Sequence, residues 1–95
     1  MTVFDYVIVG AGSSGAVLAN RLSADPTITV CLIEAGGNGR SPLITTPLGV
    51  MVLPRMPRFN WQFSSAPQTA LNNRKIGIPR GKALGGSSAI NGMVY

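Results

Sequence analysis

The fold of this chain is decided by residues 3–22, which read VFDYVIVGAGSSGAVLANRL. Val3–Val9 is a short β-branched and aromatic run, which is typical of a buried strand. A glycine-rich stretch, residues 10–15, follows it, and Ala16–Ala24 places small and apolar side chains at helical spacing. The segment therefore predicts a strand, a tight turn and a helix in immediate succession.

A second strand is predicted over residues 29–33, where the sequence is again continuous and apolar. Asp25-Pro26 ends the predicted helix before this strand, and the glycine-rich loop 35–39 follows it. Neither strand alternates apolar with polar residues, so we expect both sheet faces to be covered, as in parallel sheets. Residues 1–39 are thus predicted to form a right-handed βαβ unit of an α/β protein.

The glycines of the turn have the spacing Gly10-x-Gly12-x-x-Gly15, and an acid, Glu34, follows 19 residues after the last one. Between a strand and a helix, this pattern is the dinucleotide-binding fingerprint of a Rossmann-like fold. Gly10 permits the tight turn, Gly12 lets the backbone approach a pyrophosphate, and Gly15 lets helix and strand pack closely. Glu34 is expected to accept hydrogen bonds from ribose hydroxyls and to repel the 2′-phosphate of NADP. NAD and FAD both remain open on this motif.

Residues 40–78 are predicted to form an irregular connection, because prolines interrupt every pattern in it. Within it, Leu48–Leu53 is expected as a short helix or packed coil, residues 60–64 as a short strand, and residues 75–79 as an extended segment. We expect Trp61 and the methionines to pack in the core or beneath the dinucleotide-binding domain rather than to contact a substrate.

The charge of the chain is unevenly distributed. The net charge is +5, and all three acids lie within residues 1–39, whereas residues 40–95 carry seven of the eight basic residues. An excess of basic residues favours an anionic partner. Nucleic acid is not expected, because the basic residues are scattered and no nucleic-acid motif accompanies them. A phosphate-bearing cofactor needs only one or two of these charges.

The composition also bears on the cellular compartment. The hydrophobic content of 45% excludes a disordered chain, and a single cysteine, Cys31, excludes an intrachain disulfide. No stretch approaches the ~18 apolar residues that span a bilayer, and the first residues lack the basic start of a signal peptide. We therefore expect a cytoplasmic protein without a membrane span or a metal site.

A second glycine-rich stretch, residues 79–95, reads PRGKALGGSSAINGMVY. We expect a helical turn from Ala89, with Ser87 or Ser88 near its N-cap. Together with residues 5–23 and 32–37, this stretch closely resembles the glucose–methanol–choline (GMC) oxidoreductases, in particular their alcohol and choline dehydrogenase-like members. The stretch is similar to the first signature of that family and is more specific than the dinucleotide motif, which many families share.

The resemblance implies FAD as cofactor, held noncovalently or covalently, and oxidation of the CH–OH group of a small-molecule alcohol by hydride transfer to flavin N5. It divides residues 1–95, the N-terminal part of an FAD-binding domain, into the βαβ motif 1–39, the connection 40–78 and a flavin-contacting segment 79–95. No catalytic residue or metal ligand is assigned within the chain. Arg80 and Lys82 are candidates for charge near the pyrophosphate, with plain surface charge as the alternative. The implied cofactor residues are Gly10, Ala11, Gly12, Ser13, Ser14, Gly15, Glu34, Ala35, Arg80, Leu84, Gly85, Gly86, Ser87, Asn91, Gly92, Met93 and Val94.

The catalytic base of the family is a histidine far toward the C-terminus, and this chain contains no histidine. Histidyl attachment of FAD within these residues is excluded for the same reason. We therefore expect an N-terminal fragment whose partner is the missing C-terminal part of the same protein. Alone, the fragment is expected neither to oxidise an alcohol nor to hold FAD tightly. The alternatives are a non-redox or photochemical FAD protein (hydroxynitrile lyase-like or photodecarboxylase-like) or an inactive remnant.

Overall fold

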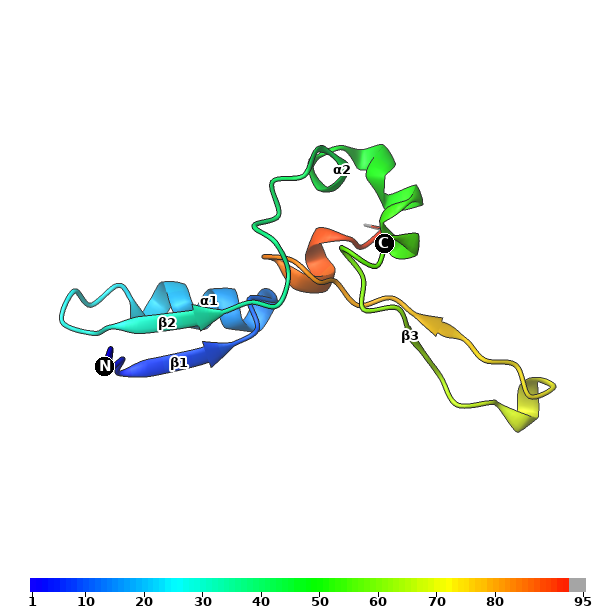
Figure 1. Ribbon diagram of the computed structural model, residues 1–95, viewed down its shortest axis with the longest axis horizontal. Coiled ribbons are helices and arrows are strands. Elements are labelled where there is room, and N and C mark those ends of the chain that lie inside the picture. Colours follow the sequence, from blue (N-terminus) through cyan, green and yellow to red (C-terminus); the bar gives the residue numbers. More distant parts are fainter. Residues whose placement is uncertain (93–95) are drawn as a thin grey trace.

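The computed structural model describes residues 1–92 of the chain. Its elements in chain order are β1 (Tyr6–Val9), α1 (Ser13–Leu22), β2 (Val30–Ile33), α2 (Pro42–Thr45), the 3-10 helices η1 (Pro47–Met51) and η2 (Leu53–Arg55), β3 (Phe63–Ser64), the 3-10 helix η3 (Thr69–Leu71), β4 (Gly77–Ile78) and the 3-10 helix η4 (Gly86–Ala89). Figure 1 shows β1, α1 and β2 at one end of an elongated chain, the β3–β4 hairpin at the other end, and η4 between them.

The predicted βαβ unit is confirmed. Strands β1 and β2 pair in parallel, from Tyr6 opposite Val30 to Val9 opposite Ile33. Helix α1 begins at Ser13 rather than at Ala16, because the second half of the glycine-rich stretch already forms its first turn. The first helical bond runs from the Ala16 N–H to the Gly12 carbonyl, at 2.9 Å. The helix therefore starts directly at the glycine that was expected to approach a phosphate.

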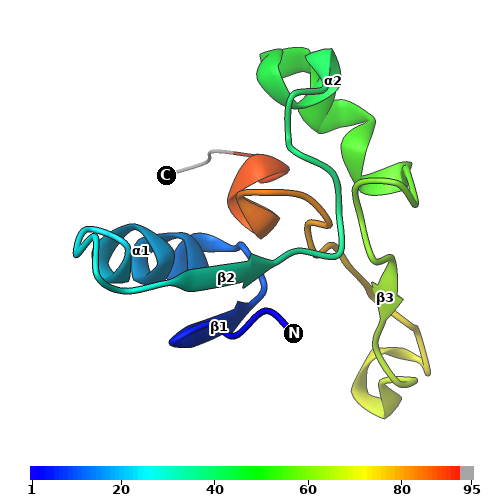
Figure 2. The same ribbon diagram turned by 60° about the vertical axis from the view of Figure 1, so that its left-hand side comes forward.

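The expectation that both faces of the sheet are covered is wrong for the described residues. Helix α1 packs against β1 and β2 on one face (Figure 2). Val7 and Val9 of β1 remain 57% and 82% exposed, and Ile33 of β2 remains 49% exposed. A continuous apolar pattern indicates that a strand can be buried on both faces, but the cover itself must come from other elements. No second helix of the described residues lies on this sheet.

The core lies outside the sheet, between the proline-rich connection and η4. The buried side chains Leu53, Phe59 and Ile90 form its centre, and the partly buried Leu43, Ile44, Met56 and Ala89 pack against them. The prolines of the connection start short helices as well as breaking patterns, because Pro42 and Pro47 occupy first-turn positions where no N–H bond is lost. The radius of gyration is 16.5 Å, whereas a compact domain of this length measures about 12 Å.

Asp5, just before β1, is hydrogen-bonded to Thr29, just before β2. One oxygen of its carboxylate accepts hydrogen bonds from the Thr29 N–H and the Thr29 hydroxyl, both at 2.7 Å, and the Asp5 N–H donates to the Thr29 carbonyl at 3.0 Å. The backbone N–H of Thr29 and then its hydroxyl lower the pKa of Asp5 below its ordinary value of 3.8. The charged form of Asp5 therefore stabilises the strand pair.

This lowered pKa predicts an acid-sensitive strand pair. A lowered carboxyl pKa contributes stability that is present above the unfolded-state pKa and lost as the pH falls through the folded-state pKa. We expect the unfolding temperature to fall below about pH 4 and the Asp5→Asn variant to show a shallower fall. Thr29→Val keeps the backbone N–H donor to Asp5 and removes the hydroxyl. The fall of its unfolding temperature should therefore lie between those of the parent and of Asp5→Asn. If the unfolding temperatures of the parent and of Asp5→Asn fell equally at acid pH, this assignment would be contradicted.

Asn60 joins three segments from inside the protein. Its side chain is 4% exposed, its Oδ1 accepts from the N–H groups of Gln62 (3.1 Å) and Arg80 (2.8 Å), and its Nδ2 donates to the Pro54 carbonyl (2.6 Å). It thereby links η2, the start of the β3–β4 hairpin and the second glycine-rich stretch.

Replacing Asn60 with alanine should leave these three backbone groups without their partner. An unsatisfied buried donor or acceptor costs about 1–3 kcal/mol, so we expect the free energy of unfolding to fall by at least that much. Chemical denaturation measures the change. Asn20→Ala on the exposed face of α1 is the control and should change stability by less than about 0.5 kcal/mol. Equal effects of the two substitutions would contradict the joining role of Asn60.

Candidate dinucleotide site

A cavity of about 740 Å³ lies where the carboxyl ends of β1 and β2 meet the β3–β4 hairpin and η4. Parallel strands bring their carboxyl ends to one edge of the sheet, and ligands of open α/β sheets bind beyond that edge. The residues that line the cavity are Val9, Gly10, Gly12, Ile33, Glu34, Ala35, Trp61, Phe63, Ile78, Arg80, Gly81, Gly86 and Ser87. The cavity is therefore formed by the βαβ unit, the β3–β4 hairpin and the second glycine-rich stretch.

The two glycine-rich stretches touch at this cavity. A Cβ on Gly86 would lie 2.8 Å from the Gly12 Cα, and Gly86 has a φ of +58°, which disfavours any side chain. The Gly85 N–H donates to the Ala11 carbonyl at 2.8 Å, and the Ser13 and Ser88 hydroxyls lie 2.6 Å apart. Segments that are about 75 residues apart in sequence thus form one continuous surface.

The N-terminus of α1 offers this surface free hydrogen-bond donors. Its N-cap, Gly12, has no side chain to cap the helix, and within residues 1–92 no protein group accepts from the N–H groups of Ser13, Ser14 or Gly15. A Cβ on Gly10 or Gly12 would meet nothing within 4 Å, so open space adjoins the helix end. Free N–H groups and the positive end of the helix dipole suit a phosphate. These residues fit a bound pyrophosphate.

Glu34 stands at the carboxyl end of β2, as predicted, and has a further role. Its Oε2 accepts from the Ala11 N–H at 2.8 Å, and its Oε1 accepts from the Gly36 N–H at 2.9 Å. It therefore ties the first glycine-rich turn to the loop after β2. Each carboxylate oxygen has a second acceptor position, so ribose hydroxyls can still bind there.

The predicted cofactor residues fall into four groups. Those that line the cavity are Gly10, Gly12, Glu34, Ala35, Arg80, Gly86 and Ser87. Those that belong to the same loops outside the lining are Ala11, Ser13, Ser14, Gly15, Leu84 and Gly85. Asn91 and Gly92 line a separate cavity of about 360 Å³ next to Ile44 and Leu53. Met93 and Val94 lie outside the described residues.

The start and the N-cap predicted for the last helical turn are both wrong, because η4 ends at Ala89 rather than beginning there. The cap of η4 is Gly85, in a left-handed conformation with φ +95°. Ser87 accepts a hydrogen bond from the Gly81 N–H at 3.1 Å instead, and Ser88 pairs with Ser13. The serines therefore connect the second glycine-rich stretch to other loops, because a Gly-Gly pair can start the turn without a side-chain cap.

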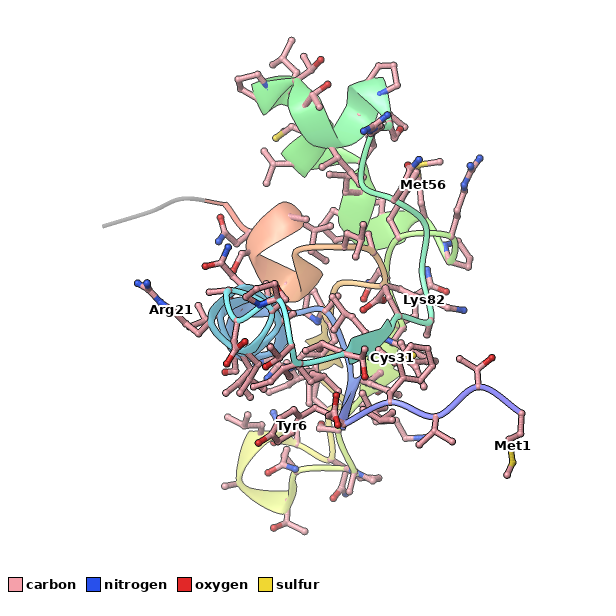
Figure 3. The ribbon with its side chains drawn as sticks, turned by 90° about the vertical axis from the view of Figure 1, so that its left-hand side faces the viewer. Met1, Tyr6, Arg21, Cys31, Met56 and Lys82 are labelled. Carbon is pink, nitrogen blue, oxygen red and sulfur yellow. The ribbon has the colours of Figure 1, made fainter. Side chains whose placement is uncertain are left out.

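Sequence reasoning missed the aromatic wall of the cavity. Trp61 was expected in the core, but it is 45% exposed and lines the cavity together with Phe63. In the predicted strand 60–64, side chains two apart point to the same face, and this spacing was the available signal. In the structure only Phe63 of the two lies in β3, and Gln62 between them has a φ of +56°. Lys82 stands over the indole, with Nζ 4.7 Å from the ring centroid, near the carboxyl end of β2 (Figure 3). Its ammonium is thus engaged by an aromatic ring.

Three features define a dinucleotide-binding protein. They are the parallel βαβ unit, the uncapped start of the helix with open space beside it, and the acid at the end of the second strand. Residues 4–95 match the GMC oxidoreductase family. The chain belongs to the GMC oxidoreductases and carries their FAD-binding region, so the predicted family, fold class and cofactor are confirmed.

Relatives and solved structures agree with this assignment. The chain is 59% identical over 93 residues to "Alcohol dehydrogenase [acceptor]" of Pseudomonas putida and 49% identical over 94 residues to an oxygen-dependent choline dehydrogenase of Photobacterium profundum. These matches cover 98% and 99% of this chain but 17% and 16% of those proteins.

The crystal structure of pyridoxine 4-oxidase from Mesorbium loti superposes with a TM-score of 0.89 at 39% identity, over 98% of this chain and 18% of that one. A formate oxidase of Aspergillus oryzae, studied for modification of its FAD, superposes with a TM-score of 0.82 at 38% identity, over 93% of this chain and 16% of that one. The chain therefore spans about one sixth of the length of the proteins that it matches.

Residues 1–92 contain neither a candidate membrane span nor a candidate metal site. No helix there is long and apolar enough to cross a membrane. No three His, Cys, Asp or Glu side chains in the same range gather as metal ligands would.

Proposed function

We propose that this chain supplies the FAD-binding part of an enzyme that oxidises the CH–OH group of a small alcohol. The observation that carries the proposal is the contact between the two glycine-rich stretches at Gly12 and Gly86, beside the uncapped start of α1. It forms a side-chain-free surface with donors for a pyrophosphate, next to a carboxylate for a ribose. FAD bound there supplies a hydride acceptor for the alcohol carbon.

The residues of this chain bind and orient rather than transfer protons. An alcohol needs a general base close to its hydroxyl. The carboxylates of Asp5 and Asp25 accept hydrogen bonds from threonines away from the cavity, and both oxygens of Glu34 accept from backbone N–H groups. The chain contains no histidine. We therefore assign the base to a part of the enzyme outside the described residues.

A chimera tests the proposed function. The matching stretch of the Pseudomonas putida relative is replaced by this chain, to which it is 59% identical. We expect the chimera to retain its flavin absorbance and alcohol-dependent reduction of an electron acceptor, within about tenfold of the parent. The control is the same chimera with Gly12→Glu, whose side chain fills the phosphate position with a negative charge. A folded chimera that contains no flavin would overturn the proposal.

A further inference from the structure

A smaller polar pocket, of about 310 Å³, lies between the loop that follows β2 and the segment that precedes β3. Residues 37–42 line it together with Arg58 and Phe59. None of these residues lines the cavity of about 740 Å³ that contains Glu34 and the two glycine-rich stretches. The smaller pocket is therefore separate from the cavity that the proposed function assigns to FAD.

Two arginines give this pocket a positive charge. Arg40 and Arg58 both line it, and no Asp or Glu does. The three acids of the chain all lie within residues 1–39 and accept hydrogen bonds from threonines or backbone N–H groups instead. Within residues 1–92, the two guanidinium groups therefore have no carboxylate partner. Two cations that share a pocket favour the binding of an anion there.

The Arg58 guanidinium is held in place by an aromatic ring. Its Cζ lies 5.5 Å from the centroid of the Phe59 ring, and Phe59 is a buried member of the core. The Phe59 carbonyl accepts from the Lys82 N–H at 2.8 Å, which fixes this residue against the second glycine-rich stretch. A guanidinium that stacks on a ring by its face keeps its N–H edge for an oxyanion, and little freedom is lost on binding.

Neutral donors complete the lining of the pocket. The Ser41 Oγ accepts from the Leu43 N–H at 3.3 Å, so the proton of its own hydroxyl is available. The Asn38 Oδ1 accepts from the Arg40 N–H at 3.2 Å, which leaves the NH2 group of Asn38 as a donor. Charged and neutral donors without a carboxylate among them form the kind of set that binds a carboxylate or a phosphate.

We propose that this pocket is an oxyanion site, in which Arg40 and Arg58 hold one carboxylate or phosphate group between them. Both kinds of group present oxygens that match the paired N–H donors of a guanidinium. The group can come from a free anion or from an Asp or Glu side chain of the rest of the enzyme, of which this chain spans about one sixth. The site lies outside the proposed function, because the FAD cavity shares no residue with it.

Thermal unfolding of the FAD-saturated Pseudomonas putida chimera tests the site, with inorganic phosphate as the probe. A ligand that binds only the folded state raises the unfolding temperature. With a free anion as the occupant, we expect about 20 mM phosphate, at an ionic strength held constant with chloride, to raise the unfolding temperature by about 2 °C or more. The variants Arg40→Met and Arg58→Met should lose this response.

A carboxylate of the enzyme itself in the pocket gives a different result. The parent chimera then shows no response to phosphate, and Arg40→Met and Arg58→Met each lower the unfolding temperature. The fall is larger at low salt than at high salt, because salt screens charge pairs. Arg40 makes no ring contact within residues 1–92, so a loss that both variants share is not the loss of the Phe59 contact.

The control for both measurements is Arg74→Met, near the tip of the β3–β4 hairpin and outside this pocket. It should change neither the phosphate response nor the salt dependence. All three variants should retain their flavin and their oxidation of alcohol, because none of these arginines lines the FAD cavity.

Two results would overturn the oxyanion site. If the parent showed no phosphate response and Arg40→Met and Arg58→Met behaved like Arg74→Met at both salt concentrations, the two arginines would be ordinary surface charges. An equal phosphate response in the parent and in both variants would place the bound anion elsewhere. Neither result affects the proposed function, which fails only if the parent chimera folds without flavin.

Discussion

Replacing Gly86 with alanine in the Pseudomonas putida chimera is expected to abolish tight FAD binding and to destabilise the protein. The new Cβ would lie 2.8 Å from the Gly12 Cα, where two backbones meet and neither can yield without moving a loop. The φ of +58° adds to the strain, since a side chain in this region costs about 1–2 kcal/mol and overpacking costs about 1–3 kcal/mol more. We therefore expect a loss of about 2–5 kcal/mol in the free energy of unfolding.

The matched control for this substitution is Gly37→Ala. Gly37 lies in the loop after β2, where a Cβ would meet nothing within 4 Å and φ is not positive. The flavin content of the purified protein and its denaturation midpoint measure both effects. Gly37→Ala should keep its flavin and its stability. If Gly86→Ala purified with full flavin content, the contact between the two glycine-rich stretches would not be the basis of the site.

Replacing Glu34 with glutamine should weaken FAD binding even though the side chain keeps its shape. The carboxylate accepts from the N–H groups of Ala11 and Gly36 on its two oxygens. An amide has only one oxygen, so its NH2 group would face one of these donors. The ribose hydroxyls also lose a charged acceptor. A hydrogen bond to a charged group is worth about 1.5–3 kcal/mol, and losing one to the ribose predicts roughly 10- to 150-fold weaker binding.

Titration of the flavin-free Pseudomonas putida chimera with FAD measures this effect. Asp25→Asn makes the same chemical change in the loop between α1 and β2, where the Asp25 carboxylate accepts hydrogen bonds from Thr27, and should leave FAD affinity unchanged. Equal FAD affinity in Glu34→Gln and the parent would show that neither the loop contact nor a ribose contact depends on the carboxylate.

The βαβ unit was predictable because its signals are local. The apolar runs that became β1 and β2, the glycine spacing between Gly10 and Gly15, and Glu34 all lie within 34 residues of the N-terminus. Each of these patterns indicates a local backbone structure, namely an extended strand, a tight turn or an open helix end. Helix α1 begins three residues earlier than predicted, at Ser13 instead of Ala16. The reason is that Gly12 serves as its N-cap, so the serines that follow are already helical.

The second half of the site was less predictable. Residues 79–95 were identified only through the family resemblance. The cap of η4, the exposure of Trp61 and the position of Asn91 in a separate cavity all depend on neighbours distant in sequence. Propensity rules contain no term for such neighbours, so they placed Trp61 in the core. The structure builds that core from Leu53 and Phe59 of the connection and Ile90 at the end of η4 instead.

The sequence by itself determined the parallel strand pair, the phosphate-binding turn, the acid at the end of β2 and the family. These features follow from backbone freedom and hydrophobic spacing over a few residues. Only the tertiary structure decided that Gly86 closes on Gly12, that Glu34 joins two loops, and that Trp61 lines the cavity with Lys82 over its ring. The physical reason is that close packing and hydrogen bonding between distant segments depend on where the whole chain brings them, and no local pattern encodes that position.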